Sequence, residues 1–247
     1  MSQIALVTGA AQGLGLTLVK VLSQAGFIVA ATDVNESLVT ETALAIDPSG
    51  EKVIPLKLDV LNKDDFVKAL ETLKQRFGRC DVLVNNAAMT PTTPVLDISA
   101  EEFDQVLAIN LRGTLFGCQV FGEYFANNGY GRIINMASMA GQMGGTASGA
   151  HYAASKGGIL TLTKIFARQF ASDGVTVNSV APGPIDVPSI RDKVPADKLE
   201  KIINEMIPVK AMSSPEFIAD IVVMLVSKNA NTVTGACWDV NGGMSMR

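Results

Sequence analysis

The first candidates for chemistry are a tyrosine and a lysine four residues apart, Tyr152 and Lys156. On an α-helix this spacing places both side chains on one face, one turn apart. A phenol ordinarily titrates near pKa ~10, and a neighbouring ammonium favours its ionised form, so we expect Lys156 to lower the pKa of Tyr152. Such a phenol would serve as a general acid or base near neutral pH. The alternative is an amphipathic helix with a half-buried tyrosine and a solvated lysine.

A glycine-rich turn, TGAAQGLG at residues 8–15, lies between an apolar run at residues 3–8 and a segment of helical periodicity at residues 16–26. Glycines let the backbone turn tightly and approach a pyrophosphate, and the N-terminus of the following helix attracts negative charge. Glycine clusters also occur in ordinary turns. The order of strand, glycine-rich turn and helix favours nucleotide binding.

A second apolar run at residues 27–32 ends at Asp33, ~20 residues beyond the glycine-rich turn. A carboxylate at this distance suits hydrogen bonding to the ribose diol of an adenosine, and it would repel the 2′-phosphate of NADP. No arginine or lysine lies in the turn or beside Asp33. The pattern therefore predicts NAD as the cofactor. The alternative is that Asp33 caps the next helix, a role that Asn35 fits equally well.

Apolar runs and helical segments alternate along the rest of the chain, which predicts a doubly wound parallel sheet in a single domain at residues 1–247. Ligands bind beyond the carboxyl ends of such strands, and the proline-containing residues 184–210 would form a lid there. Ser99 and Glu102 form a capping-box pattern at the start of a long helix. We expect strands at residues 3–8, 27–32, 53–58, 81–84, 132–136, 175–180 and 237–240, and helices at residues 16–26, 34–46, 64–77, 102–127, 152–173 and 213–227.

Composition narrows the class of protein. The 247 residues are 48% hydrophobic and carry a net charge of −4, with no basic patch for nucleic acid. No stretch approaches the ~20 apolar residues of a membrane span. The single histidine, His151, and the three cysteines form neither a metal-ligand set nor a disulfide framework. The first residues lack the pattern of a secretory signal, so we expect a cytoplasmic protein.

With these residues placed, the sequence resembles the short-chain dehydrogenase/reductase family from Thr8 to Gly243. The family landmarks occur in order: TGAAQGLG at 8–15, Asp59-Val60, NNAA at 85–88, Asn110, Ser138, Tyr152 with Lys156, and Pro182-Gly183. The resemblance implies an α/β fold: a single-domain Rossmann sheet of seven parallel strands with helices on both faces. It also implies an oxidoreductase that transfers a hydride between a nicotinamide cofactor and a secondary alcohol or ketone.

The resemblance assigns a role to each landmark. Tyr152 is the general acid/base, Ser138 polarises the substrate oxygen, and Lys156 binds the nicotinamide ribose and lowers the pKa of Tyr152. Asn110 kinks its helix and holds a water that links Lys156 to solvent. The residues expected along NAD are Gly9, Gln12, Gly13, Leu14, Gly15, Asp33, Asp59, Val60, Asn86, Ala87, Tyr152, Lys156, Pro182, Gly183 and Ile185.

Three residues depart from the family pattern, and none removes a catalytic group. Ala88 replaces a common glycine, and Val187 replaces a threonine that contacts the nicotinamide end, although backbone groups of Ile185 could serve instead. Asn241 replaces a common aspartate, which concerns packing more than chemistry. His151 adjoins the catalytic tyrosine, but helical neighbours point to different sides. We therefore expect a packing or loop-bonding role for this histidine rather than a proton relay.

The leading hypothesis is an NAD-dependent alcohol dehydrogenase acting on a small alcohol, polyol or sugar-like substrate, with Tyr152 as the general acid/base. The alternatives are an NADPH-dependent 3-ketoacyl-type reductase and a non-catalytic NAD-binding regulatory protein. An enoyl reductase is a further alternative, but those enzymes usually have a wider tyrosine–lysine spacing than Tyr152 and Lys156. The apolar helices at residues 102–127 and 152–173, together with the family resemblance, predict a homotetramer.

Overall fold

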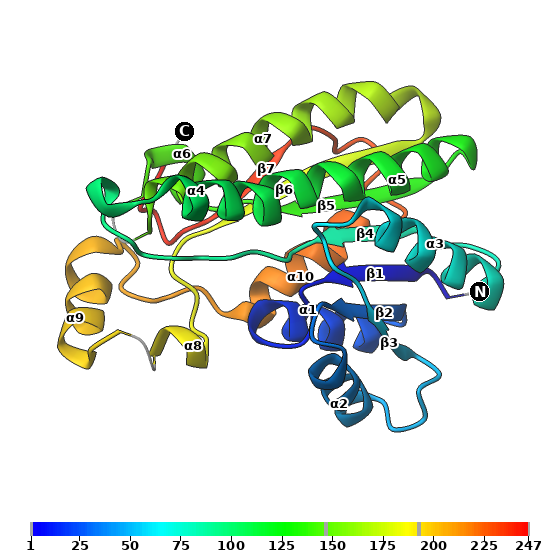
Figure 1. The fold of residues 1–247 in the computed structure, drawn as a ribbon, viewed down its shortest axis with the longest axis horizontal. Coiled ribbons are helices and arrows are strands. Elements are labelled where there is room, and N and C mark those ends of the chain that lie inside the picture. Colours follow the sequence, from blue (N-terminus) through cyan, green and yellow to red (C-terminus); the bar gives the residue numbers. More distant parts are fainter. Residues whose placement is uncertain (1, 146–147, 192–193, 247) are drawn as a thin grey trace.

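A sheet of seven parallel strands forms the centre of the computed structural model. The structure describes residues 2–145, 148–191 and 194–246, without the side chains of residues 189 and 190. The strand order is β3-β2-β1-β4-β5-β6-β7 (Figure 1). The order reverses direction between β1 and β4, which makes the carboxyl edge there the usual ligand site of this architecture. The strands are β1 (Ile4–Thr8), β2 (Ile28–Asp33), β3 (Val53–Lys57), β4 (Val82–Asn85), β5 (Gly131–Met136), β6 (Val175–Pro182) and β7 (Cys237–Val240).

Helices cover both faces of the sheet. The helices α1, α2 and α10 pack on one face, and α3, α5 and α7 pack on the other. The α-helices are α1 (Gly13–Gln24), α2 (Glu36–Ile46), α3 (Lys63–Phe77), α4 (Ala100–Leu107), α5 (Gly113–Asn127), α6 (Ala140–Met143), α7 (Ala150–Phe170), α8 (Pro188–Arg191), α9 (Ala196–Lys201) and α10 (Pro215–Val226). Short 3₁₀ helices η1 (Val95–Asp97) and η3 (Ala171–Asp173) and π-helical segments η2 (Ala108–Arg112) and η4 (Ile202–Met206) complete the described elements.

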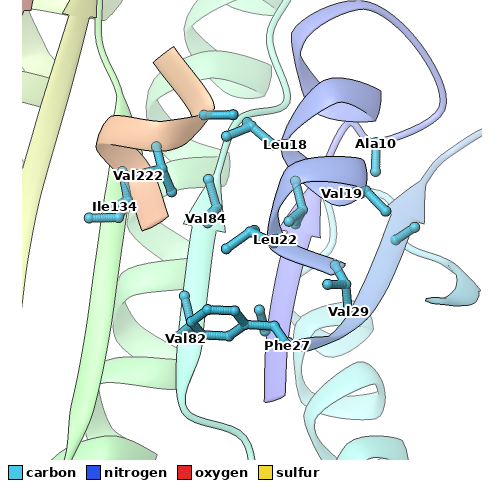
Figure 2. Close-up of a cluster of buried hydrophobic side chains, with 14 of the residues drawn as sticks. Ala10, Leu18, Val19, Leu22, Phe27, Val29, Val82, Val84, Ile134 and Val222 are labelled. Carbon is cyan, nitrogen blue, oxygen red and sulfur yellow. The ribbon is translucent and has the colours of Figure 1, made fainter. Parts of the chain in front are cut away.

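The core lies on both sides of the sheet because successive strand residues point to opposite faces. On β4, Val82 and Val84 belong to the cluster under α1 and α10, whereas Leu83 belongs to the cluster under α3 and α5. Figure 2 shows Leu22 of α1 and Val222 of α10 directed at the strands. Burial on both faces explains why the strands are nearly continuous apolar runs and why their positions are predictable from sequence.

The long helix expected at residues 102–127 is interrupted. Helix α4 starts at Ala100, the π-helical turn η2 follows, and α5 then runs to Asn127. Asn110 lies within η2 and is fully buried, so the residue that is unfavourable in a regular helix occupies the irregular turn. π-Helical turns are frequent at functional sites.

Strand β6 is longer than expected, because it continues through Pro182 instead of ending near Val180. Ala181 and Pro182 pair with Asp239 and Val240 of β7, and Pro182, which has no N–H to donate, is the last residue of β6. The extension carries the backbone of β6 to the carboxyl edge of the sheet, where the other candidate residues lie.

The segment expected to form a lid contains α8, α9 and η4, and residues 192–193 of it lie outside the described residues. It extends beyond the carboxyl ends of the strands, at the left of Figure 1. Its base is fixed by a bridge between Ile185 and Ser213 and by the Asp186–Arg191 ion pair, whose two contacts measure 2.5 and 2.7 Å. Arg191 therefore has an acidic partner within the segment itself.

Candidate active site

The glycine-rich turn between β1 and α1 has the geometry that its sequence predicts. Gly9 and Gly13 have φ angles of +64° and +56°, in the left-handed region that favours glycine. A Cβ on Gly15 would lie 2.0 Å from the carbonyl oxygen of Gly9, so only glycine fits there. The turn is therefore compact enough to bring backbone amides together at the start of α1.

The N-terminus of α1 differs from those of α2, α3, α4 and α10. Each of those helices has an Asn or Ser side chain that accepts a hydrogen bond from a first-turn amide. Gln12, the N-cap residue of α1, makes no such bond, and no acidic side chain lies in the first turn. The amides of α1 and the positive end of its dipole fit an anionic group such as a pyrophosphate.

Asp33 lies at the end of β2, beside the glycine-rich turn. Its carboxylate accepts hydrogen bonds from the backbone N–H groups of Ala11 at 3.2 Å and Asn35 at 3.0 Å. Asn35 is the N-cap of α2, since its side chain accepts from the N–H of Leu38 at 3.1 Å. The alternative of Asp33 as the helix cap is therefore wrong, and this partly exposed carboxylate keeps acceptor capacity for a ligand.

Asn86 and Ala87, which follow β4, hold the glycine-rich turn in place. The Asn86 side-chain amide donates to the carbonyls of Thr8 at 3.0 Å and Gly9 at 3.1 Å. The backbone N–H groups of Asn86 and Ala87 both donate to the Thr8 hydroxyl, at 3.0 and 3.1 Å. Thr8 is thus a supporting residue to which sequence reasoning assigned no role, although it is the last residue of the strand before the turn.

Asp59 and Val60 follow β3 at the same edge. The Asp59 carboxylate accepts from the N–H of Leu61 at 2.9 Å, and its own N–H donates to Asp65 at 3.2 Å. Val60 packs against Gly113, where an added Cβ would come within 2.9 Å of the valine side chain. The N–H of Leu58, the residue before Asp59, donates to the carbonyl of Asp33 at 3.0 Å, so this turn lies beside the end of β2.

Pro182 is the last residue of β6, and Gly183 and Ile185 follow it. The carbonyl of Pro182 accepts from the N–H of Met139 at 2.9 Å, and the N–H of Gly183 donates to Val240 at 2.8 Å. The carbonyl of Ile185 accepts from the N–H of Val187 at 3.0 Å, so this backbone group already has a partner. The side chain of Asn241 accepts from the N–H of Gly243 at 3.0 Å.

Asn110 connects three parts of the site. Its side-chain oxygen accepts from the N–H of Met89 at 2.8 Å, and its side-chain nitrogen donates to the Met89 carbonyl and to the Ser155 hydroxyl, each at 3.0 Å. Ser155 in turn donates to the carbonyl of Tyr152 at 2.7 Å. Sequence reasoning missed Met89 and Ser155 as partners of Asn110. The water expected at Asn110 stays a prediction.

Ser138, Tyr152 and Lys156 meet beyond the carboxyl end of β5. The hydroxyls of Ser138 and Thr90 lie close enough to the Tyr152 phenol to lower its pKa. The Lys156 ammonium donates to the carbonyl of Met136 at 2.6 Å and lies 5.6 Å from the centroid of the Tyr152 ring. The shared helix face predicted from the four-residue spacing is therefore present, on a helix whose lysine is buried rather than solvated.

The expected lowering of the Tyr152 pKa is wrong for the chain alone. Burial raises the pKa of Tyr152, and this effect outweighs the hydrogen bonds from Ser138 and Thr90, which lower it. Burial also lowers the pKa of Lys156 from 10.5 to about 8. Sequence spacing indicates which groups are neighbours, but it does not show that both are withdrawn from water, and here desolvation decides the direction.

Two other features of the described residues bear on the class of protein. No helix among residues 2–145, 148–191 and 194–246 is long and apolar enough to cross a membrane. Within the same part of the chain, no three His, Cys, Asp or Glu side chains are grouped closely enough to hold a metal ion. Cys118 is buried, as expected of a small apolar residue, whereas Cys237 is partly exposed.

Comparisons with known proteins agree with this geometry. A family model described as enoyl-(acyl carrier protein) reductase matches residues 9–245. The (S)-acetoin-forming diacetyl reductase of Staphylococcus aureus strain Mu50 is 36% identical, covering 100% of this chain and 99% of that protein. The 3-oxoacyl-acyl-carrier-protein reductase of Thermotoga maritima is 32% identical, covering 98% of this chain and 97% of that protein.

A solved structure of a short-chain dehydrogenase from Bacillus anthracis superposes with a TM-score of 0.89 at 30% identity, covering 99% of this chain and 97% of that one. It extends the agreement from sequence to the seven-stranded parallel sheet. The glycine-rich turn, the buried asparagine, and the serine, tyrosine and lysine all lie at one edge of that sheet. Together with the matches in sequence and structure, they show that the chain belongs to the short-chain dehydrogenase/reductase family of oxidoreductases.

Proposed function

We propose that the protein is an NAD-dependent dehydrogenase that transfers a hydride between NAD(H) and a small secondary alcohol or ketone, with Tyr152 as the general acid/base. The observation that carries the proposal is the meeting of the Tyr152 phenol with the Ser138 hydroxyl, one helical turn from the Lys156 ammonium. These groups lie at the sheet edge that also carries the glycine-rich turn. A proton-transfer group and a nucleotide cradle are thus on the same edge.

The side chains divide the chemistry between them. Bound nicotinamide accepts the hydride in oxidation and supplies it in reduction. The Tyr152 phenolate takes the hydroxyl proton of the alcohol as the hydride leaves the carbinol carbon, and the phenol returns a proton to the carbonyl oxygen in the reverse direction. Ser138 donates to the substrate oxygen on which negative charge develops. The Lys156 ammonium, 5.6 Å from the centroid of the Tyr152 ring, would bind the nicotinamide ribose of the cofactor.

The cofactor path follows the carboxyl edge of the strands. The uncapped start of α1 would hold the pyrophosphate, with Gly9, Gln12, Gly13, Leu14 and Gly15 around it. The carboxylate of Asp33 would accept from the adenosine ribose hydroxyls, and the absence of Arg or Lys at Gln12 and beside Asp33 disfavours a 2′-phosphate. Asp59, Val60, Asn86 and Ala87 lie along the same edge, and Pro182, Gly183 and Ile185 lie at its nicotinamide end.

A second candidate is an NADPH-dependent 3-ketoacyl reductase. The observation in its favour is the 32% identity, across almost the entire length of both chains, to the 3-oxoacyl-acyl-carrier-protein reductase of Thermotoga maritima. Asp33 favours NAD over NADP as the cofactor. The 36% identity to the diacetyl reductase favours a small ketone or alcohol as the substrate. The two candidates differ in both cofactor and substrate size, so one screen separates them.

The screen measures initial rates with NAD⁺ and NADP⁺ over polyols, sugars, hydroxy acids, aryl alcohols, acetoin and a 3-hydroxyacyl thioester. We expect NAD⁺ to be preferred and a small secondary alcohol to be the best substrate. Tyr152→Phe should abolish turnover while NADH binding, followed by its fluorescence, persists. Preference for NADP⁺ would show that Asp33 does not select the cofactor, and turnover unaffected by Tyr152→Phe would refute the assignment of the general acid/base.

We also propose that the protein is a cytoplasmic homotetramer. Large apolar side chains remain exposed on the outer helices, including Phe103 of α4 at 39% and Ile165 of α7 at 53%. Such side chains are suited to burial against a second copy of the chain. Light scattering at micromolar concentration should give a mass near four times 26.0 kDa, and a monomer would contradict the proposal.

A further inference from the structure

The only histidine of the chain, His151, lies fully buried in the first turn of α7, directly before the catalytic tyrosine. Its Nδ1 accepts a hydrogen bond from the backbone N–H of Tyr152 at 3.0 Å. Gly149, the N-cap residue of α7, offers no side chain to the helix, and a Cβ there would lie 2.2 Å from Cε1 of the histidine. The imidazole thus takes the place of a capping side chain and holds the amide of Tyr152.

The other ring nitrogen faces an acidic residue from a different helix. Because Nδ1 acts as an acceptor, the proton of the neutral ring is on Nε2. Nε2 lies 3.3 Å from Oε1 of Glu102, a long contact, and it has no well-aligned hydrogen bond within the described part of the chain. The imidazole therefore lies between the backbone of Tyr152 and the carboxylate of Glu102.

Glu102 is not used as its capping-box position suggests. Ser99 accepts from the N–H of Glu102 at 3.1 Å, but the Glu102 carboxylate turns away from the helix end and accepts from the Thr93 hydroxyl at 2.7 Å. These contacts keep the pKa of Glu102 below its usual value, chiefly through Thr93 and then through His151, so the group is ionised at neutral pH. One carboxylate is shared between Thr93 and His151.

Thr93 belongs to the loop at residues 89–94, which forms a wall of the candidate site. The loop is bound to its surroundings at three points: Met89 by Asn110, the Pro91 carbonyl by the N–H of Gly149 at 3.0 Å, and Thr93 by Glu102. Thr90, between these points, places its hydroxyl against the Tyr152 phenol. The loop and the first turn of α7 are therefore held as one unit.

We propose that His151 is a positioning residue, which fixes the Tyr152 backbone through Nδ1 and aligns it with the loop at residues 89–94 through Nε2 and Glu102. The inference rests on the proposed function, since it assigns His151 a part in orienting that general acid/base. Neither ring nitrogen faces the glycine-rich turn. Loss of His151 should therefore impair the alcohol or ketone step while dinucleotide binding stays intact.

Isosteric variants separate the two contacts. In His151→Asn the side-chain oxygen can replace Nδ1 as the acceptor for Tyr152, while the contact with Glu102 is lost. In His151→Gln the amide nitrogen can replace Nε2 toward Glu102, while the Tyr152 contact is lost. Glu102→Gln keeps the Tyr152 contact and weakens the contacts of residue 102 with His151 and Thr93. Asp104→Asn on the same helix is the matched control, because Asp104 is exposed.

We expect His151→Ala to lower kcat/KM for the alcohol by about tenfold to a hundredfold, the usual cost of a small misplacement of a reacting group, with KM for NAD⁺ changed less than about twofold. His151→Asn should restore kcat but keep a raised alcohol KM, as Glu102→Gln does, and His151→Gln should keep a low kcat. Asp104→Asn should match wild type. If His151→Ala leaves all constants within about twofold, or if it impairs NAD⁺ and alcohol equally, the positioning role is wrong.

A second measurement does not depend on turnover. In the untagged protein the imidazole nitrogens of His151 give the only histidine signals of the chain, so a long-range ¹H–¹⁵N spectrum needs no assignment. We expect the Nε2–H tautomer, with signals that shift in Glu102→Gln and not in Asp104→Asn. The Nδ1–H tautomer would overturn the inference even in an active enzyme. A wild-type protein that binds NADH but turns over no substrate would instead contradict the proposed function.

Discussion

Replacing Lys156 by methionine should stabilise the folded chain at neutral pH while it removes activity. The lysine is only 3% exposed, and burial lowers its pKa from 10.5 to about 8. Among the described residues its ammonium makes one hydrogen bond, to the Met136 carbonyl at 2.6 Å. Methionine has a similar length without the charge, so the variant keeps the packing and loses the desolvation cost.

The magnitude follows from two opposing effects. The pKa of Lys156 falls from 10.5 to about 8 in the folded chain. At ~1.4 kcal/mol per pKa unit, burial therefore destabilises the charged lysine by ~3 kcal/mol. Losing the bond to Met136 leaves a buried carbonyl without a partner, which costs about 1–3 kcal/mol. We therefore expect the free energy of unfolding of Lys156→Met to exceed that of wild type at pH 7 by about 1 kcal/mol.

The pH dependence gives the sharper test. Below pH 8 the lysine is charged in both states, and the folded chain bears the whole cost. Between pH 8 and 10.5 the folded state releases its proton before the unfolded state does, so wild-type stability rises with pH across this window. The stability of wild type relative to Lys156→Met should therefore increase by ~3 kcal/mol from pH 7 to beyond pH 10.5.

Urea unfolding at pH 7 and at pH 10 measures most of this rise, which is complete only above pH 10.5, with equal m-values as the check that the same surface is exposed. Lys164→Met is the control, because Lys164 is an exposed lysine of the same helix and its replacement should change stability by no more than ~0.5 kcal/mol. A Lys156→Met chain that is clearly less stable than wild type at pH 7, with a difference that does not vary with pH, would refute the reasoning.

Four further outcomes are expected. Because burial raises the pKa of Tyr152, kcat/KM for alcohol oxidation should rise with pH through the alkaline range, since the phenolate is the base; a flat profile in initial-rate assays from pH 6 to 10 would contradict this. Gly15→Ala, whose Cβ would lie 2.0 Å from the Gly9 carbonyl, should raise KM for NAD⁺ by on the order of tenfold, or ~1.4 kcal/mol, while the alcohol KM changes little. Asn110→Ala loses three hydrogen bonds of 2.8–3.0 Å and should lower the free energy of unfolding by about 2–5 kcal/mol in urea titrations, so a loss below ~1 kcal/mol would be inconsistent with the described contacts. Lys210 has a φ of +58°, which glycine adopts without strain, so Lys210→Gly should raise Tm and increase the free energy of unfolding by at most about 1 kcal/mol. A lower Tm would show that the contacts of the Lys210 side chain stabilise the fold by more than the backbone strain destabilises it.

The positions of the strands and of the catalytic edge could be predicted because parallel strands buried on both faces leave a simple apolar signal. The runs that end at Thr8 and Asp33 mark β1 and β2 with an error of at most one residue at either end. The same signal does not show where pairing continues past a proline, as it does at Pro182, because the continuation depends on a partner strand more than fifty residues away.

The contacts within the site were less predictable, because they depend on which polar groups face each other after folding. The sequence marks Asn86 and Asn110 as site residues, but only the structure shows that Asn86 holds the Thr8–Gly9 backbone and Asn110 holds Met89. The direction of the Tyr152 pKa was missed for the same reason, since desolvation cannot be read from a four-residue spacing.

The uncapped start of α1 has a consequence for the lifetime of the protein. This helix packs Leu18, Val19 and Leu22 into the core cluster shared with α10, so α1 is held by the packing of the core. An anion bound there stabilises only the native state, by an amount that grows with ligand concentration relative to Kd. Degradation of transiently unfolded chains tracks that equilibrium. The dinucleotide level would thus regulate how much of the enzyme survives, as well as how fast it works.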